Sequence, residues 1–292
     1  MYKKPAIFLL SILVPASLLF SIAGCSARGD ELLPRKERLR VATTTSLYDT
    51  GLWGYLEPMF EEKYGVEVDV LYAGTGIALE YGKRGDVDVI TVHSKLQEEA
   101  FVAEGYGLER VPFAYNYFLI VGPSNDPAGI KGMSPEDAFR TLQGAGSGAF
   151  VSRGDDSGTH GKEKAIWESA GFGYEDIRKA GDWYIEAGRG MGPTLLMASE
   201  KQAYTLSDMG TFLAYKGKID LVPVAEKGSV LLNVYSVIAC NPDKNPKVNR
   251  EMADNMVNFL TSPEIQELLG KYGTRQYGMP LFIPCAGAEP SS

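Results

Sequence analysis

The sequence predicts an α/β fold with mostly parallel sheets. Short apolar runs typical of buried strands alternate along the chain with capped or amphipathic segments typical of helices. Several of the predicted strands also run directly into turns that are rich in glycine or in hydroxyl side chains. In a parallel sheet such turns lie at the carboxyl ends of the strands, where ligands bind.

The predicted strands differ in their apolar patterns. Leu39–Ala42 is the first predicted strand, and in the second the valines of Val66–Val70 alternate with acidic residues, as in a strand with one buried face. The other predicted strands cover residues 87–92, 117–121, 149–151, 183–185, 203–206, 221–224 and 234–239.

The helices are predicted between these strands. The apolar residues of 52–60 share one helical face, and Pro58 is expected to kink or interrupt that helix. Ser134 followed by Pro135 marks a helix start, and Ser262 followed by Pro263 marks another that runs to Gly270. These signals are structural and carry no chemistry.

One loop between a predicted strand and a predicted helix is unusually rich in donors. Ser152–His160 reads SRGDDSGTH and lies between the strand 149–151 and a helix predicted over 161–170. A guanidinium, hydroxyls, glycines and the free N–H groups of a helix start together suit an anion. An ordinary helix capped by Ser157 or Thr159 explains the same residues, so the spacing alone leaves both interpretations open.

Three further strand ends run into similar turns, which makes helix capping alone a poor explanation. Because the carboxyl ends of parallel strands meet at one edge of a sheet, four such junctions favour a shared binding cleft. The three turns are Thr43–Ser46, Ala73–Ala78 and Gly188–Pro193.

The N-terminus has the pattern of a targeting signal. Lys3 and Lys4 precede an apolar run over residues 6–20, which is too short to span a bilayer. The run leads into Ile22–Cys25, which resembles the lipobox of exported lipoproteins. In that family the chain is cleaved before the cysteine, which is then acylated.

We therefore expect a lipoprotein signal peptide over residues 1–24 and a polar tether over 25–38. The lipid on Cys25 would hold the protein on the extracytoplasmic side of a membrane without crossing it. An ordinary secretion signal with an incidental cysteine is the alternative interpretation.

Composition bounds the mature protein and its partners. Removal of the signal leaves about 255 residues, enough for one large domain or two medium ones. The net charge of −8 becomes −10 when two lysines are lost with the signal, and no basic patch occurs, which excludes nucleic acid as a partner.

Cys240 and Cys285 are able to pair in an oxidising compartment. So few cysteines and histidines leave little room for a metal centre, and we expect neither a metal nor a cofactor.

At its donor-rich turns the chain resembles the substrate-binding proteins of ABC-type tungstate transporters. That family is marked by a Thr-Thr-Thr-Ser turn, here Thr43–Ser46, and by Ser-Arg-Gly-Asp-x-Ser-Gly-Thr-His, here Ser152–His160. Both motifs match without departure, and the similarity extends from about Leu39 to Pro280. The longer motif is specific, and the shorter one is supportive.

The resemblance implies a two-lobed periplasmic-binding-protein-like type II fold, in which two parallel-sheet lobes are joined by a two-strand hinge. With crossings near Gly122 and Leu231, lobe 1 would comprise residues 39–122 plus 231–284, and lobe 2 residues 123–230. The lobes would close over a tetrahedral oxyanion, tungstate or molybdate, which is the transported ligand. The partners implied are an ABC permease and a separate ATPase subunit, because no P-loop motif occurs in this chain. We expect a monomer.

A fully deprotonated dianion needs donors on every oxygen, because its desolvation is otherwise costly. Arg153 would supply the one full positive charge, in a planar fork geometry. The remaining ligand-binding residues expected from hydroxyls, glycines and free N–H groups are Thr45, Ser46, Thr75, Gly76, Ser157, Gly158, Thr159 and Gly192.

Phosphate is the alternative ligand. The stretch Arg153–Thr159 also fits the Arg-x-Asp-x-Ser-Gly-Thr loop of phosphate-binding proteins, in which the aspartate accepts the proton that phosphate still carries. If Asp155 points into the cleft, phosphate is favoured; if it pairs with Arg153 or caps the helix, tungstate is favoured.

Two other function classes fit the sequence less well. A hydrolase would need Ser157, His160 and a neighbouring aspartate as a triad, but the serine stands one place too late for G-x-S-x-G. His93 and His160 are expected to be structural. Arg-Gly-Asp occurs at 28–30, 84–86 and 153–155, and such tripeptides arise by chance in glycine-rich charged chains.

Overall fold

The structure is a computed structural model that describes residues 37–144 and 149–290, which lie within the compact unit Lys36–Ser292. The predicted signal peptide, Cys25 and the tether up to residue 36 lie outside the described residues.

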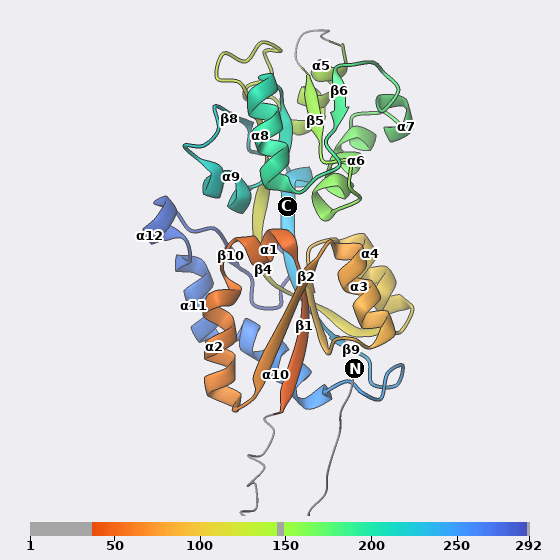
Figure 1. The fold of residues 1–292 in the computed structure, drawn as a ribbon, viewed down its shortest axis with the longest axis vertical. Coiled ribbons are helices and arrows are strands. Elements are labelled where there is room, and N and C mark those ends of the chain that lie inside the picture. The colour runs from red at the N-terminus through yellow and green to blue at the C-terminus, as the bar shows by residue number, and fades with distance from the viewer. Residues whose placement is uncertain (1–36, 145–148, 291–292) are drawn as a thin grey trace, which may run out of the picture. The chain divides into compact units, whose positions relative to one another are not determined.

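An eight-stranded mixed sheet forms the framework of this unit (Figure 1). Its strands are β1 (Arg38–Thr44), β2 (Glu67–Ala73), β3 (Val89–Val92), β4 (Gly107–Gly122), β7 (Thr205–Asp208), β8 (Val222–Ala225), β9 (Leu232–Cys240) and β10 (Ile283–Pro284). Their main order is β10-β4-β9-β3-β1-β2, and β7 and β8 pair with β4 away from this path. A separate two-stranded sheet pairs β5 (Phe150–Ser152) with β6 (Tyr184–Glu186) in parallel.

The long strand β4 belongs to both halves of the unit. From Gly107 to Tyr117 it pairs with β9, and from Phe118 to Gly122 it pairs with β7 and β8. Figure 1 shows β4 and β9 running between the two groups of elements. The change of partner at Tyr117 comes earlier than the predicted crossing at Gly122, and the lobe boundaries given above stay a prediction.

The two-lobed α/β class is confirmed, and the direction of the strands refines it. β1 is parallel to β2 and β3, as predicted. Within the described residues, β4 and β9 are antiparallel to each other and to all of their neighbours, because one carries the chain out of the first group of strands and the other brings it back. The main sheet is therefore mixed rather than mostly parallel.

Helices cover both faces of these sheets. In Figure 1, α3 and α4 lie on one side of the lower strands and α2, α10 and α11 on the other. The helices are α1 (Thr45–Asp49), α2 (Trp53–Tyr64), α3 (Thr75–Arg84), α4 (Lys95–Ala103), α5 (Pro135–Gly144), α6 (Gly158–Ser169), α7 (Tyr174–Ile177), α8 (Met191–Lys201), α9 (Met209–Tyr215), α10 (Arg250–Thr261), α11 (Pro263–Lys271) and α12 (Thr274–Tyr277).

Alternate residues of β4 supply different cores, as the period of a strand requires. Phe118 and Ile120 belong to a cluster that includes Trp167 of α6, whereas Leu119 and Val121 belong to the largest cluster, which also includes Trp53 of α2. A third cluster lies under α3 and α4. Burying apolar area at about 25 cal/mol per Å² is the main favourable term that fixes these layers.

Of the two outcomes expected at Pro58, a kink or an interruption, the interruption does not occur. α2 runs as one helix from Trp53 to Tyr64 with Pro58 inside it. Pro58 cannot bond to the carbonyl of Gly54, but both residues are exposed, so water can satisfy that oxygen. The helix predicted over 161–170 begins earlier, at Gly158.

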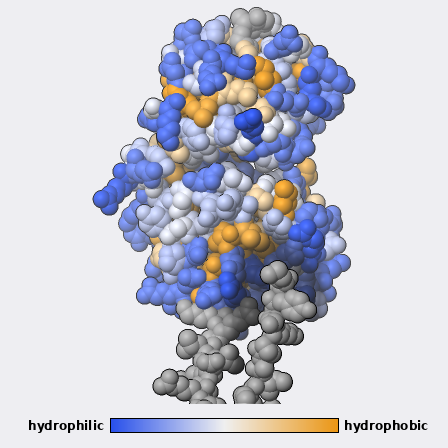
Figure 2. All heavy atoms as spheres, in the orientation of Figure 1, coloured by the Kyte–Doolittle hydropathy of each residue, from blue (hydrophilic) through white to orange (hydrophobic). Residues whose placement is uncertain are grey.

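The surface agrees with the acidic composition. The face in Figure 2 is mostly hydrophilic, with hydrophobic residues in separate patches. Within residues 37–144 and 149–290, no helix is long and apolar enough to cross a membrane.

Candidate anion-binding site

All four donor-rich junctions of the sequence contribute to one cavity of about 330 Å³. Each lies at the carboxyl end of a strand or at the helix start that follows, as the strand-end rule predicts. The cavity is lined by Thr44, Thr45, Ser46, Ala73, Gly74, Thr75, Ile77, His93, Arg153, Asp155, Ser157, Gly158, Thr159 and Gly190.

A second cavity of about 340 Å³ adjoins the first and shares Thr45, Ser46, Arg153 and Gly190 with it. Of the residues expected to bind ligand, Thr45, Ser46, Thr75, Arg153, Ser157, Gly158 and Thr159 line the first cavity, and Gly192 lines the second. Gly76 lines neither of these two cavities. It borders a separate hollow between α3 and α4.

Several helices begin at the cavity. The first-turn N–H groups of a helix have no partner within the helix, so here they are available to a ligand. The residues before α1, α3, α6 and α8 are Thr44, Gly74, Ser157 and Gly190, and all of them line the cavity. Ser157 is also an ordinary cap, because its Oγ accepts the N–H of His160 at 3.3 Å. The hydroxyl that accepts this bond still has its own proton to donate, so Ser157 can cap the helix and bind an anion at the same time.

Arg153 is the cation of the cavity, and its side chain is only 10% exposed. Its Nη2 donates to Asp155 Oδ2 at 2.5 Å, and its Nη1 lies 3.5 Å from Thr159 Oγ1. Its Nε is buried and has no hydrogen-bond partner within the described residues. These two contacts engage only two of the five N–H donors of the guanidinium, so Nε–H and the second protons of Nη1 and Nη2 are left for an anion.

Unpartnered polar atoms gather around the cavity. Among the described residues, five buried side-chain atoms lack partners, and three of them, Thr75 Oγ1, His93 Nδ1 and Arg153 Nε, belong to residues that line the cavity. A buried polar group left unpaired costs about 1–3 kcal/mol. Such groups indicate a site built for a polar ligand.

His93 is a site residue that the sequence reasoning assigned to a structural role. It directly follows β3, its ring lines the cavity, and its Nε2 lies 3.0 Å from Ser46 Oγ. Burial lowers the pKa of His93 to about 4, so the ring is neutral at neutral pH. Because β3 is parallel to β1, the strand-end rule could have found His93.

Asp155 lines the first cavity, yet both of its oxygens are engaged. Oδ2 pairs with Arg153, and Oδ1 accepts the N–H of Ser157 at 3.2 Å. Asp155 thus pairs with Arg153, which is one of the two arrangements expected to favour tungstate over phosphate; the other, a helix cap, is supplied by Ser157 instead.

The Ser157–His160 pair is not arranged as a nucleophile and base. His160 Nδ1 accepts the N–H of Asp156 at 2.9 Å, and its Nε2 lies 2.6 Å from the Tyr174 hydroxyl. Both ring nitrogens are therefore committed away from the Ser157 hydroxyl. Within the described ranges, Cys240 and Cys285 are unpaired, and no cluster of three or more His, Cys, Asp or Glu is placed to hold a metal ion.

Two groups of elements joined by β4 and β9, with a donor-lined cavity, are the features of a two-lobed solute-binding protein. Residues 33–264 match the family model described as the PBP superfamily domain. The chain is 45% identical over 286 residues to the tungstate-binding protein TupA of Peptoclostridium acidaminophilum, and the match covers 95% of this chain and 98% of that protein.

Two solved structures are similar to this chain over most of its length. The tungstate-binding protein TupA from Desulfovibrio alaskensis G20 has 39% identity and a TM-score of 0.76, covering 86% of this chain and 99% of that one. The tungstate ABC transporter structure from Geobacter sulfurreducens has 47% identity and a TM-score of 0.72, covering 81% and 99%. The chain therefore belongs to the PBP superfamily and, within it, to the family of the TupA proteins.

Proposed function

We propose that this chain binds tungstate in the donor-lined cavity and delivers it to an ABC importer. The observation that carries the proposal is the state of Asp155, the carboxylate that lines the first cavity, whose two oxygens already accept from Arg153 and from the N–H of Ser157. The polar groups left for a ligand are then mostly donors, which suits a fully deprotonated dianion. The names of the relatives support the same ligand.

Phosphate is less well served by this arrangement. At neutral pH phosphate carries one or two protons, and each proton needs an acceptor in the site. An aspartate that is already paired with Arg153 and bonded to a backbone N–H is a poor acceptor. Molybdate has the same charge and tetrahedral shape as tungstate, so the same donors serve it.

The position of the donors suits transport rather than catalysis. Thr45, Ser46 and Thr75 approach from one group of elements, and Arg153 and Ser157 from the other. An anion that contacts both groups favours the closed arrangement, and a permease can recognise that difference. We propose binding without chemical conversion, with the ATPase on a separate chain.

A thermal-shift titration of the mature protein with tungstate, molybdate, sulfate and phosphate tests the proposal. Tungstate is expected to raise the melting temperature most, because binding to the native state stabilises it by mass action. Light scattering on the same samples is expected to give the mass of a monomer. A larger shift with phosphate than with tungstate, or no shift with any anion, would contradict the proposed function.

We propose further that the protein is exported and lipid-anchored through Cys25, which rests on the lipobox-like Ile22–Cys25. Cys25→Ser is expected to leave the chain unlipidated, so that it is released from the membrane or stays uncleaved. Fractionation followed by mass spectrometry of the N-terminus measures this. Normal cleavage with unchanged membrane retention would count against the anchor.

A further inference from the structure

The loop that follows β5 has two residues with left-handed backbone. Gly154 has φ of +58° and Asp156 has φ of +53°, which is unfavourable for a residue with a side chain. Such a turn persists only when its surroundings hold it. The groups that hold this turn also position the anion cavity, because the same loop supplies four of its lining residues, Arg153, Asp155, Ser157 and Thr159.

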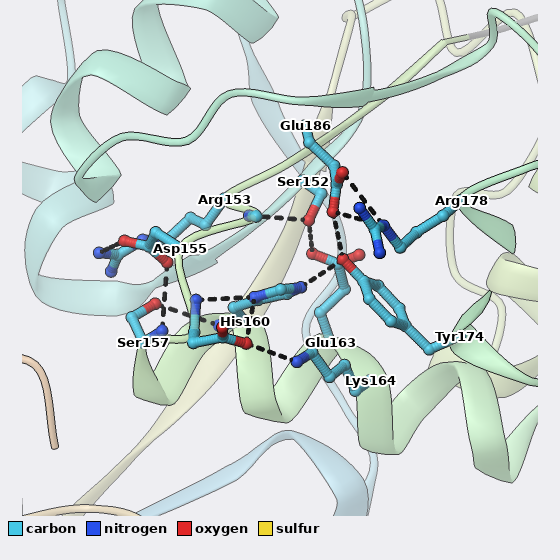
Figure 3. Close-up of polar contacts among 12 residues, drawn as sticks. Ser152, Arg153, Asp155, Ser157, His160, Glu163, Lys164, Tyr174, Arg178 and Glu186 are labelled. Atoms are coloured by element: carbon cyan, nitrogen blue, oxygen red, sulfur yellow. Dashed lines mark hydrogen bonds and ion pairs between the residues drawn. The ribbon is translucent and has the colours of Figure 1, made fainter. Parts of the chain in front are cut away.

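Side chains of α6 hold both left-handed residues, His160 directly and Glu163 through Ser152 of β5; Figure 3 labels these three side chains. The N–H of Gly154 donates to Ser152 Oγ at 3.1 Å, and that hydroxyl donates to Glu163 Oε2 at 2.7 Å. The N–H of Asp156 donates to Nδ1 of His160 at 2.9 Å. The carboxylate of Asp156 is exposed: its Oδ1 bonds to Lys164 at 2.7 Å and lies farther away, at 3.5 Å, from Nδ1 of His160. The buried tie of Asp156 is therefore the hydrogen bond from its backbone N–H to the His160 ring.

Further hydrogen bonds fix the proton of the His160 ring. Because Nδ1 accepts from a backbone N–H, the proton of the neutral ring lies on Nε2, which donates to the Tyr174 hydroxyl at 2.6 Å. That hydroxyl in turn donates to Glu186 Oε1 at 2.6 Å, and Arg178 Nε donates to Glu186 Oε2 at 3.2 Å (Figure 3). Burial, and then the charge of Lys164, lower the pKa of His160 and favour this neutral ring.

His160 also ties its own helix start to the loop. Its backbone N–H donates to Ser157 Oγ, while its ring accepts from Asp156, so both bonds tie the first turn of α6 to the two residues that precede the helix. The turn at Gly154–Asp156 folds the Asp155 side chain back, so that its carboxylate accepts hydrogen bonds from Arg153 and from the N–H of Ser157. His160 itself does not line the anion cavity.

We propose that His160 is a positioning residue for the anion loop, Arg153–Thr159, and that it acts through the acceptor Nδ1 rather than by contact with the anion. The proposal rests on the proposed function for its effect on tungstate affinity. The hydrogen-bonded state of the ring is independent of any ligand, which allows the two to be tested separately.

Two amide variants of His160 distinguish a role as hydrogen-bond acceptor from a role in filling space. His160→Asn places its amide oxygen at the δ position, where it can accept from Asp156, whereas His160→Gln places it one atom farther along. We expect His160→Asn to stay within about 2-fold of the wild-type tungstate affinity, and His160→Gln and His160→Ala to weaken it by about 3- to 10-fold. Affinities for the two amide variants that are equally weak, or better for His160→Gln, would overturn the proposal.

Nitrogen NMR of the ligand-free wild type shows directly which nitrogen of the His160 ring carries the proton. The spectrum is simple, because the protein has only two histidines, His93 and His160. The spectrum of His160→Asn assigns the signals. We expect His160 protonated on Nε2, and slow exchange of the Asp156 amide that becomes fast in His160→Gln. A proton on Nδ1 would overturn the proposal even if tungstate binds. If the wild type does not bind tungstate, the proposed function fails, and these two NMR measurements still decide the role of His160.

Discussion

Replacing Arg153 by alanine is expected to weaken tungstate binding by about 30- to 4,000-fold, which corresponds to about 2–5 kcal/mol. The guanidinium is the cation that lines the cavity and is nearly buried, so little water screens its charge. Its loss also leaves Asp155 without a counter-charge, and that carboxylate would then repel the dianion. The fold should be unaffected, because Arg153 belongs to none of the hydrophobic clusters.

Isothermal titration calorimetry with three further variants makes this prediction sharper. Arg153→Lys keeps the charge but loses the planar fork, so it should restore only part of the affinity. Asp155→Asn added to Arg153→Ala should recover the part of the loss that is due to repulsion. Arg140→Ala, which removes an exposed arginine of α5, is the matched control and should bind as the wild type does. If Arg153 served only to pair with Asp155, as a surface ion pair worth about 0–1 kcal/mol, both single Arg153 variants would stay within about threefold of the wild type.

The second large effect concerns Glu163, a carboxyl group buried under the anion loop at 2% exposure. Burial raises its pKa to about 7, although Tyr184, Ser152 and Trp167 all hydrogen-bond to it. Because the pKa in the folded state lies above the usual value of 4.5, Glu163 stabilises the fold at low pH. That contribution is present below pH 4.5 and is lost as the pH rises through about 7.

Glu163→Gln imitates the protonated carboxyl group, because its amide can donate to Ser152 while its oxygen still accepts from Tyr184 and Trp167. At pH 8 we expect the variant to be more stable to unfolding than the wild type by about 3 kcal/mol, with the gap closing towards pH 5. Denaturant unfolding across this range measures the difference. Both histidines have lowered pKa values and destabilise the fold at acid pH, but they cancel in the comparison of variant with wild type.

The matched control for this experiment is Glu168→Gln on the exposed side of the same helix, α6. It removes the same charge from the surface and should follow the wild type at every pH. Parallel stability profiles for wild type and Glu163→Gln would show that the buried carboxyl group does not titrate in this range.

The sequence alone was sufficient for the features that depend on neighbouring residues. Apolar or alternating runs located most of the strands at least in part, and the helix starts at Pro135 and Pro263 are confirmed because capping is a local interaction. Parallel pairing explains why the donor-rich junctions after β1 and β2 meet at one edge of the main sheet, and why those after β5 and β6 meet at one edge of the small sheet. That the two edges face one cavity is decided by the packing of the two sheets. The motifs at Thr43–Ser46 and Ser152–His160 correctly indicated the family.

Two parts of the fold were not visible in the local pattern. The first part of β4, from Gly107 to Asn116, contains charged residues and Pro112, and it pairs with β9 through a register shift that accommodates the proline. The two strands β4 and β9 are also antiparallel, which follows from the route of the chain between the lobes. Neither feature has a signature within a window of a few residues.

The tertiary structure alone decided which groups are left for the anion. Ser46 meets His93, Asp155 turns back onto Arg153, and His160 is oriented by Tyr174 and Glu186. Hydroxyls and rings can either donate or accept, and a carboxylate can face a ligand or a guanidinium, so residue type fixes none of these choices. The sequence determined where the polar groups gather, and the packing of distant segments determined which of them remain unpaired, because a hydrogen bond is set by the distance and angle of two groups in space.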